Sequence, residues 1–110
     1  MKTESDVKMV SVFVSEGDHY HGHSLYEAIV SMLHAEGVSG ATAVKGVMGY
    51  GASSHMHAAH LLDLSENLPV TIVFADTAEK VERVLLKLDE MIESGLVLVD
   101  DVHAMRYSRG

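Results

Sequence analysis

Two amphipathic helical segments, each placed between β-favouring runs, constrain the fold of this chain more than any other feature. The first opens on a capping-box sequence at Ser24, repeats apolar residues on one face and closes at Gly37. The second follows a cap at Asp76 or Thr77 and is expected to end at Gly95. Both are long enough to connect two parallel strands of one sheet.

Four β-branched, mostly apolar runs surround these helices and are predicted to be strands. They cover residues 7–14, 40–48, 68–75 and 102–107, with a short extended piece and a kink at the aspartates 100–101 before the last run. The order is therefore βαββαβ. That order is typical of the ferredoxin-like α+β fold, an antiparallel sheet with both helices on one face.

Adjacent apolar residues in the first run indicate that the sheet is apolar on both faces. Val12, Phe13 and Val14 follow one another, and neighbouring residues of a strand point to opposite faces. Two helices cover only one of these faces. We therefore expect a second copy of the chain to cover the other, which makes homo-oligomerisation a hypothesis.

Length, composition and charge limit the class of protein. At 110 residues the chain is expected to form one domain, residues 1–110. The absence of cysteine excludes a disulfide framework and thiolate metal sites, and the formal net charge of −8 disfavours a nucleic-acid partner. The N-terminal residues lack the apolar region of a signal peptide, so we expect a cytoplasmic protein without direct membrane insertion.

A glycine-rich and histidine-rich stretch begins in the second predicted strand, within residues 40–64. Gly49 and Gly51 flank Tyr50 there. Glycine admits positive φ and lets a ligand approach backbone N–H groups, so the stretch is a candidate phosphate-binding loop. The pattern taken alone favours a hairpin tip with turn glycines over a ligand-binding loop.

The chain resembles the PII signal-transduction family along nearly its whole length. The resemblance is carried by a strand, a glycine-aromatic-glycine step and a second strand, with the residues Gly40, Thr42, Gly49, Tyr50, Gly51, His57, Leu68, Pro69, Val70 and Ile72. The fit is closer to a short PII-like branch of uncharacterised function, the DUF190 or UPF0166 type, which shares residues 25–29, 40–42, 49–52, 64–69 and 88–91.

The resemblance implies a homotrimer of ferredoxin-like subunits that binds an adenine nucleotide in each cleft between neighbours. The positions that would bind the nucleotide are Thr42, Lys45, Gly49, Tyr50, Gly51, Arg106 and Arg109. The two arginines suit bidentate phosphate contacts. The implied role is that of a regulatory signalling protein and not an enzyme, which acts on a transporter or a metabolic enzyme through the loop at residues 52–60.

Two departures from the signalling PII proteins change what is expected. The loop is short and has no tyrosine between Gly51 and Leu64, so nucleotidylation of a loop tyrosine is not expected. Only Ser94 and Gly95 stand where a glycine-rich phosphate loop would precede the last strand. AMP or ADP is therefore favoured over ATP.

Two groups of histidines support an alternative, a metal-binding protein similar to the trimeric divalent-cation-tolerance family CutA. Alternate residues of an extended chain point the same way, so His19, His21 and His23 could share one divalent ion. His55 and His57 could do the same. The residues alone favour solvated loop histidines, since no thiolate or supporting partner accompanies them.

Overall fold

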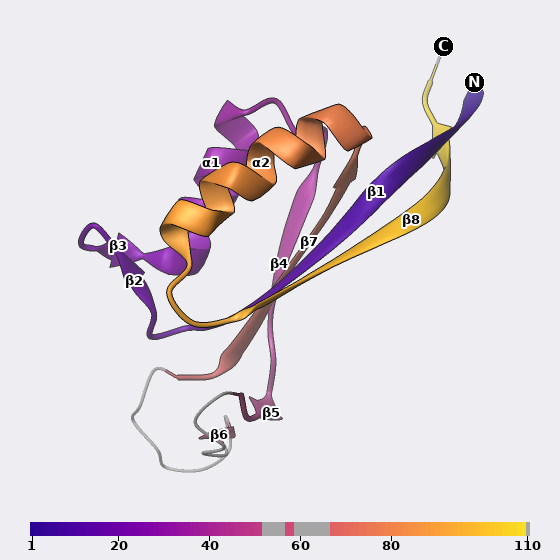
Figure 1. The fold of residues 1–110 in the computed structure, drawn as a ribbon. Coiled ribbons are helices and arrows are strands. Elements are labelled where there is room, and N and C mark those ends of the chain that lie inside the picture. Colours follow the sequence, from indigo (N-terminus) through magenta and orange to yellow (C-terminus); the bar gives the residue numbers. More distant parts are fainter. Residues whose placement is uncertain (52–56, 59–66, 110) are drawn as a thin grey trace.

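The computed structural model describes residues 1–51 and 67–109 and the backbone of residues 57–58, and it confirms the ferredoxin-like α+β fold (Figure 1). The elements are β1 (Lys2–Ser15), β2 (His19–Tyr20), β3 (His23–Ser24), α1 (Leu25–Ala35), β4 (Ala41–Lys45), β5 (Met48–Gly49), β6 (His57–Ala58), β7 (Pro69–Asp76), α2 (Ala78–Met91) and β8 (Leu96–Tyr107). The main sheet is antiparallel in the order β4-β7-β1-β8, and both helices lie on one face of it.

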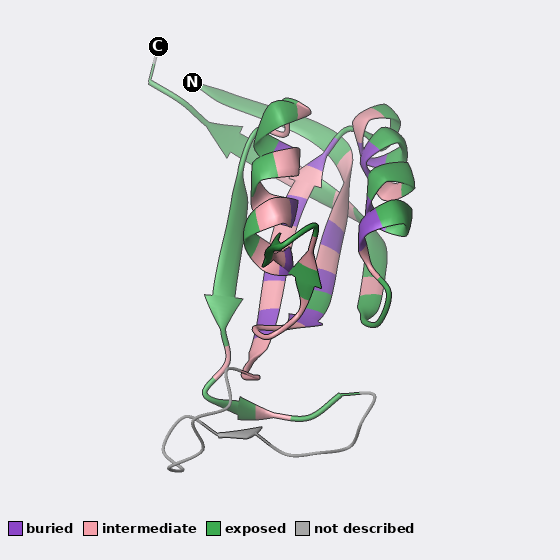
Figure 2. Cartoon of the chain, turned by 90° about the vertical axis from the view of Figure 1, so that its left-hand side faces the viewer, coloured by how far each residue is buried: buried purple, intermediate pink, exposed green. Residues whose placement is uncertain are grey.

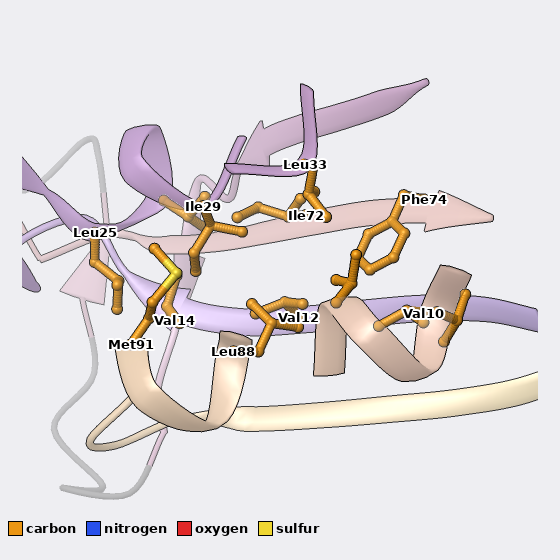
Figure 3. Close-up of a cluster of buried hydrophobic side chains, with 13 residues drawn as sticks. Val10, Val12, Val14, Leu25, Ile29, Leu33, Ile72, Phe74, Leu88 and Met91 are labelled. Atoms are coloured by element: carbon orange, nitrogen blue, oxygen red, sulfur yellow. The ribbon is translucent and has the colours of Figure 1, made fainter. Parts of the chain in front are cut away.

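The core lies between the helices and one face of the sheet. Residues of β7 alternate between buried and partly buried, the period expected of a strand with one face on a core. Figure 3 shows the buried cluster to which both layers contribute, made of Val10, Val12, Val14, Leu25, Ile29, Leu33, Val70, Ile72, Phe74, Val81, Val84, Leu88 and Met91. The apolar stripes predicted for the two helices are confirmed as their core faces.

The opposite face of the sheet is apolar and has no covering layer within the described chain. Cross-strand partners share a face, so pairing with Phe13 and Ser11 places Leu96 and Leu98 on this side. We call this surface the open face; its apolar members are Val7, Met9, Phe13, Val44, Val73, Ala75, Leu96, Leu98, Val102 and Ala104. The exposed parts of β4 and β8 are green in Figure 2. The sheet thus carries apolar residues on both faces, as predicted.

β1 and β8 continue past the end of β7 as a two-stranded ribbon, which Figure 1 shows beside the two termini. His103 of β8 lies between two carboxylates of β1, with Nδ1 3.0 Å from Asp6 Oδ1 and Nε2 3.1 Å from Glu4 Oε1. Hydrogen bonds to Asp6 and then to Glu4 raise the pKa of His103 above its ordinary value. These contacts tie the two strands of the ribbon together.

The predicted kink at Asp100 and Asp101 is wrong, because β8 is continuous from Leu96 to Tyr107. β8 is an edge strand of the sheet, and charged side chains on an edge can reach water. Asp101 also forms an ion pair with Lys8 of β1 at 2.7 Å. Two consecutive acidic residues therefore fit within this strand.

The second predicted strand is shorter than expected, because β4 ends at Lys45 and the chain then leaves the main sheet. Pro69 begins the partner strand β7 and has no N–H to donate, so the ladder cannot continue beyond it. The Pro69 carbonyl accepts the Gly46 N–H at 2.7 Å. The chain then enters β5, which pairs with β6 outside the main sheet.

Both helices begin at the predicted caps, but only one cap bonds as expected. Thr77 Oγ1 accepts the Lys80 N–H at 3.3 Å at the start of α2. Ser24 precedes α1, yet its buried hydroxyl has no hydrogen-bond partner, so the predicted capping box does not form. The Asp18 carbonyl accepts the Leu25 N–H at 2.8 Å and satisfies one of the amides at this helix start. Neither helix of the described chain has the length and hydropathy needed to cross a bilayer.

Asp76 ties the segment before β4 to the start of α2. One carboxylate oxygen accepts the Ser39 N–H at 3.1 Å, and the other accepts the Thr77 N–H at 2.8 Å. Lys80 lies 3.7 Å from the same carboxylate and donates to the Gly37 carbonyl at 2.8 Å. Burial alone would raise the pKa of Asp76, but the two amides and Lys80 outweigh it and hold that pKa below its ordinary value.

Asp76→Asn is expected to lower the free energy of unfolding by about 1–3 kcal/mol near pH 7, because two amides lose a charged acceptor. With a lowered folded-state pKa, the stabilisation is full above the unfolded-state pKa and is lost as the pH falls through the folded-state value. The difference in the free energy of unfolding between wild type and variant, the stability gap, should therefore shrink below about pH 4. Urea unfolding measures this gap, with the exposed Asp89→Asn as control. A gap that stays constant down to about pH 3 would contradict the role of the charge.

Candidate functional site

The predicted residues 49–51 lie in a cavity of about 620 Å³ at one end of the sheet. Residues 94–96, which lead from α2 into β8, form a second wall, and Phe13, Asp18 and Asn67 contribute to the others. We call this space the glycine cavity. It brings the glycine-aromatic-glycine step next to the Ser94–Gly95 pair that the sequence placed before the last strand.

Gly95 is required by close packing and does not end a helix as predicted. α2 ends at Met91, four residues earlier (95 − 91). A Cβ added at Gly95 would lie 2.7 Å from the Phe13 carbonyl oxygen and 3.3 Å from the side chains of Ile92 and Val14. The backbone entering β8 therefore passes against β1, and this contact shapes the wall of the cavity.

The sequence suggests that glycine is needed at positions 49 and 51 because it admits positive φ. The structure does not support this reason for either residue. In the described chain positive φ occurs at His21, Gly22 and Gly37. A Cβ at Gly49 would lie 3.0 Å from the Pro69 ring, so close packing accounts for this glycine. A Cβ at Gly51 would have nothing within 4 Å. Gly51 thus leaves space beside the cavity.

The glycine cavity has no lysine or arginine among the described residues that line it. Among the described lining residues Asp18 alone is an acidic or basic residue, and its carboxylate accepts the Ser15 N–H at 2.9 Å. Lys45, predicted to contact the nucleotide, forms an ion pair with Glu16. The described lining therefore supplies no guanidinium or ammonium group to a phosphate.

Arg106 lies at the other end of the sheet and contacts the segment that leads into β4. Its guanidinium donates to Ser39 Oγ at 3.0 Å. Asp76 holds the Ser39 N–H, and Thr42 follows on β4. Arg109 is exposed in the C-terminal segment after β8. We call Ser39, Arg106 and Arg109 the arginine end; Thr42 pairs with Val73, nearer the middle of β7.

The glycine cavity and the arginine end lie too far apart to contact one phosphate group within a single chain. Pro69 packs against Gly49 at the first residue of β7, and Asp76 holds Ser39 at its last. These positions are seven residues apart (76 − 69), which is about 23 Å at about 3.3 Å per residue. The structure therefore places the predicted glycines and the predicted Arg106 at opposite ends of β7, with Thr42 between them beside Val73.

Sequence reasoning missed Ser39 and Asn67 and gave Ser94 only a negative role. Ser39 directly precedes the Gly-Ala-Thr motif that carries the resemblance, so its position was a usable signal. Ser94 could also be identified from the sequence, because it forms a turn-like Ser-Gly step before a strand. No pattern in the sequence singles out Asn67.

The described histidines do not form the predicted three-histidine metal site. The segment is not extended, because His21 and Gly22, with φ of 49° and 81°, reverse the chain between β2 and β3. His23 pairs with Tyr20, whereas His19 pairs with Ser24. Among the residues that the structure describes, no three His, Cys, Asp or Glu side chains are grouped to hold a metal ion.

Most of the predicted target-binding loop at residues 52–60 lies outside the described residues. His55 and the side chain of His57 belong to that part, so the second predicted histidine pair stays a prediction. The backbone of His57 pairs with Gly49, and that of Ala58 pairs with Met48. This pairing places the backbone of two loop residues beside Gly49, which lines the glycine cavity.

The sheet order and the two helices on one face are those of the PII-like fold. The chain belongs to the DUF190 family, described as Uncharacterized ACR, whose sequence profile matches residues 7–104. The resemblance found in the sequence is thereby confirmed. A UPF0166 protein of Methanocaldococcus jannaschii is 39% identical over 100 residues, which are 90% of this chain and 92% of the relative.

Solved structures show the same fold. CPII, a nitrogen regulatory PII-like protein from Thiomonas intermedia K12, was solved bound to ADP and bicarbonate; it has a TM-score of 0.70 and 26% identity over 93% of this chain and 91% of CPII. CPII bound to ADP, AMP and bicarbonate has a TM-score of 0.72 at 23% identity and the same coverage. The divalent ion tolerance protein CutA1 from Ehrlichia chaffeensis shares the fold, with a TM-score of 0.60 and 11% identity over 87% of this chain and 80% of CutA1.

Proposed function

We propose that this chain is a regulatory protein that binds an adenine nucleotide at junctions between copies of itself. The observation that carries the proposal is the division of the site: a glycine cavity whose described lining residues include no lysine or arginine at one end of the sheet, and Arg106 at the other. A junction that joins these two ends from neighbouring copies supplies both a pocket and the guanidinium groups that phosphate needs. The nucleotide complexes of CPII support this class of ligand.

The same division favours a closed ring of subunits. Joining the glycine cavity of one copy to the arginine end of the next is a head-to-tail contact, and such contacts form rings when the rotation closes. The open face gives the ring an apolar interior, since Phe13, Val44, Leu96 and Leu98 are exposed in a single chain. The family resemblance sets the number of subunits in the proposed ring at three.

AMP or ADP is the proposed ligand in preference to ATP. Ser94 and Gly95 are the segment before β8 that lines the cavity, and they offer fewer donors than a glycine-rich loop. The arginine end contributes two guanidinium groups, Arg106 and Arg109. These groups suit one or two phosphates better than three. Bound nucleotide would then order the loop at residues 52–60, through which the protein regulates a transporter or an enzyme.

Calorimetric titration with AMP, ADP, ATP and cyclic AMP tests this function. We expect saturable binding of AMP or ADP, at least about tenfold tighter than that of ATP, with no nucleotide consumed. Sedimentation of the same sample should give the mass of three chains. Absence of binding by all four nucleotides at about 1 mM would reject the proposal.

A further inference from the structure

A second cavity, of about 720 Å³, lies on the helix side of the sheet. Its walls are the β2–β3 hairpin, one stripe of α1 and the last turns of α2; Figure 1 shows the hairpin beside these helix ends. We call it the helix cavity. No residue that the structure describes lines both this cavity and the glycine cavity, and the helix cavity lies on the side of the sheet away from the open face.

Acidic and basic side chains both line the helix cavity. Glu27 comes from α1, and Glu90 and Lys87 come from α2. In the part of the chain that the structure describes, none of these three side chains takes part in a hydrogen bond or an ion pair. Their formal charges sum to −1. Two carboxylates suit an amine, and the ammonium suits a carboxylate.

An apolar and aromatic surface accompanies these charges. Met91 is buried, Met32 is partly buried, and both line the cavity. The Tyr20 and His21 rings stack with centroids 4.0 Å apart and an interplanar angle of 14°. The positive φ of His21 and Gly22 is that of a two-residue hairpin turn, which fixes where this ring pair stands. Thioether and aromatic groups of this kind favour an apolar body in the ligand.

We propose that the helix cavity binds a small zwitterion of the amino-acid class. The amine contacts Glu27 and Glu90, the carboxylate contacts Lys87, and an apolar side chain packs against Met32 and Met91. The cavity volume lies within the range of about 300–1,000 Å³ typical of small-molecule sites. This site does not depend on the proposed nucleotide site.

The test uses L-methionine as the probe, with isobutylamine and isovalerate as ligands that carry only the amine or only the carboxylate. Titration followed by amide NMR should show saturable binding of L-methionine with a Kd of about 1 mM or tighter. The shifted amides should fall within residues 20–32 and 87–91. Lack of any shift at about 10 mM, or equal affinity for isobutylamine, would overturn the proposal.

Matched variants separate this site from nonspecific binding. Glu27→Gln with Glu90→Gln should weaken L-methionine binding about tenfold or more, because both partners of the amine are lost. Glu82→Gln with Glu93→Gln changes the net charge equally on residues that do not line the cavity and should leave binding unchanged. An equal loss of L-methionine affinity in the two double variants would overturn the assignment. Nucleotide affinity should be the same in all these variants, so a failed nucleotide titration does not bear on this result.

Discussion

A chain carrying Arg106→Ala and Arg109→Ala should lose nucleotide affinity by about 100-fold or more. Hydrogen bonds to charged groups contribute about 1.5–3 kcal/mol each, and about 1.4 kcal/mol corresponds to a factor of ten. A second variant, Gly51→Phe, should block the glycine cavity from a position where an added Cβ meets nothing within 4 Å. Both changes lie outside the buried cluster, so both variants should fold. Arg83→Ala, an exposed arginine of α2, is the matched control and should bind as wild type does.

Mixing the two defective variants should restore binding, because each junction takes its cavity from one neighbour and its arginines from the other. Random assembly leaves about a quarter of the junctions intact, since each half is intact with a chance of about one half. Calorimetric stoichiometry of co-refolded samples measures this recovery. Two affinity tags, one on each variant, identify the mixed oligomers. If these mixed oligomers regain no nucleotide-binding sites, the glycine cavity and the arginine end do not meet between subunits.

The order of strands and helices could be predicted because it depends on local patterns. Alternation in β7 and the apolar stripe of α2 follow from burial of one face, and each is visible within a short window of sequence. The second apolar face could also be predicted, from Val12, Phe13 and Val14. These features need no knowledge of which strand lies beside which.

The extent of β1 and β8 could not be predicted, because it arises from contacts between distant parts of the chain. The first residues of β1 are polar and have no strand-like pattern, but they pair with β8 and are held there by contacts of His103 with Glu4 and Asp6. The sequence pattern predicts a kink at Asp100 and Asp101 because it does not distinguish an edge strand from a central one.

The sequence proposes the residues of the candidate site but does not indicate their arrangement. Thr42 and Gly49 are near in sequence, and this nearness suggested one site. Strand β4 instead leads away from the arginine end, and the hydrogen bond between Arg106 and Ser39 joins residues separated by 67 positions. The division of the site between two ends of the sheet follows from that topology, and only the paired strands reveal it.

Leu98→Asp is expected to separate the copies and to abolish nucleotide binding, although it changes neither the glycine cavity nor the arginine end. Leu98 pairs with Ser11 on the open face and is 45% exposed in the single chain. A carboxylate placed in an apolar junction without a partner costs several kcal/mol, which is enough to reverse association. In the single chain the same carboxylate stays in water.

Leu86→Asp is the matched control, because Leu86 is 68% exposed on α2, on the helix side of the sheet. This variant should keep the mass and the nucleotide affinity of the wild type. Sedimentation and calorimetry on the same samples then distinguish two results that would contradict the proposed junction. Leu98→Asp that remains assembled would show that the open face is not the junction. Leu98→Asp that is monomeric and still binds nucleotide would show that one chain holds a complete site, and a shared junction would then have no role in binding.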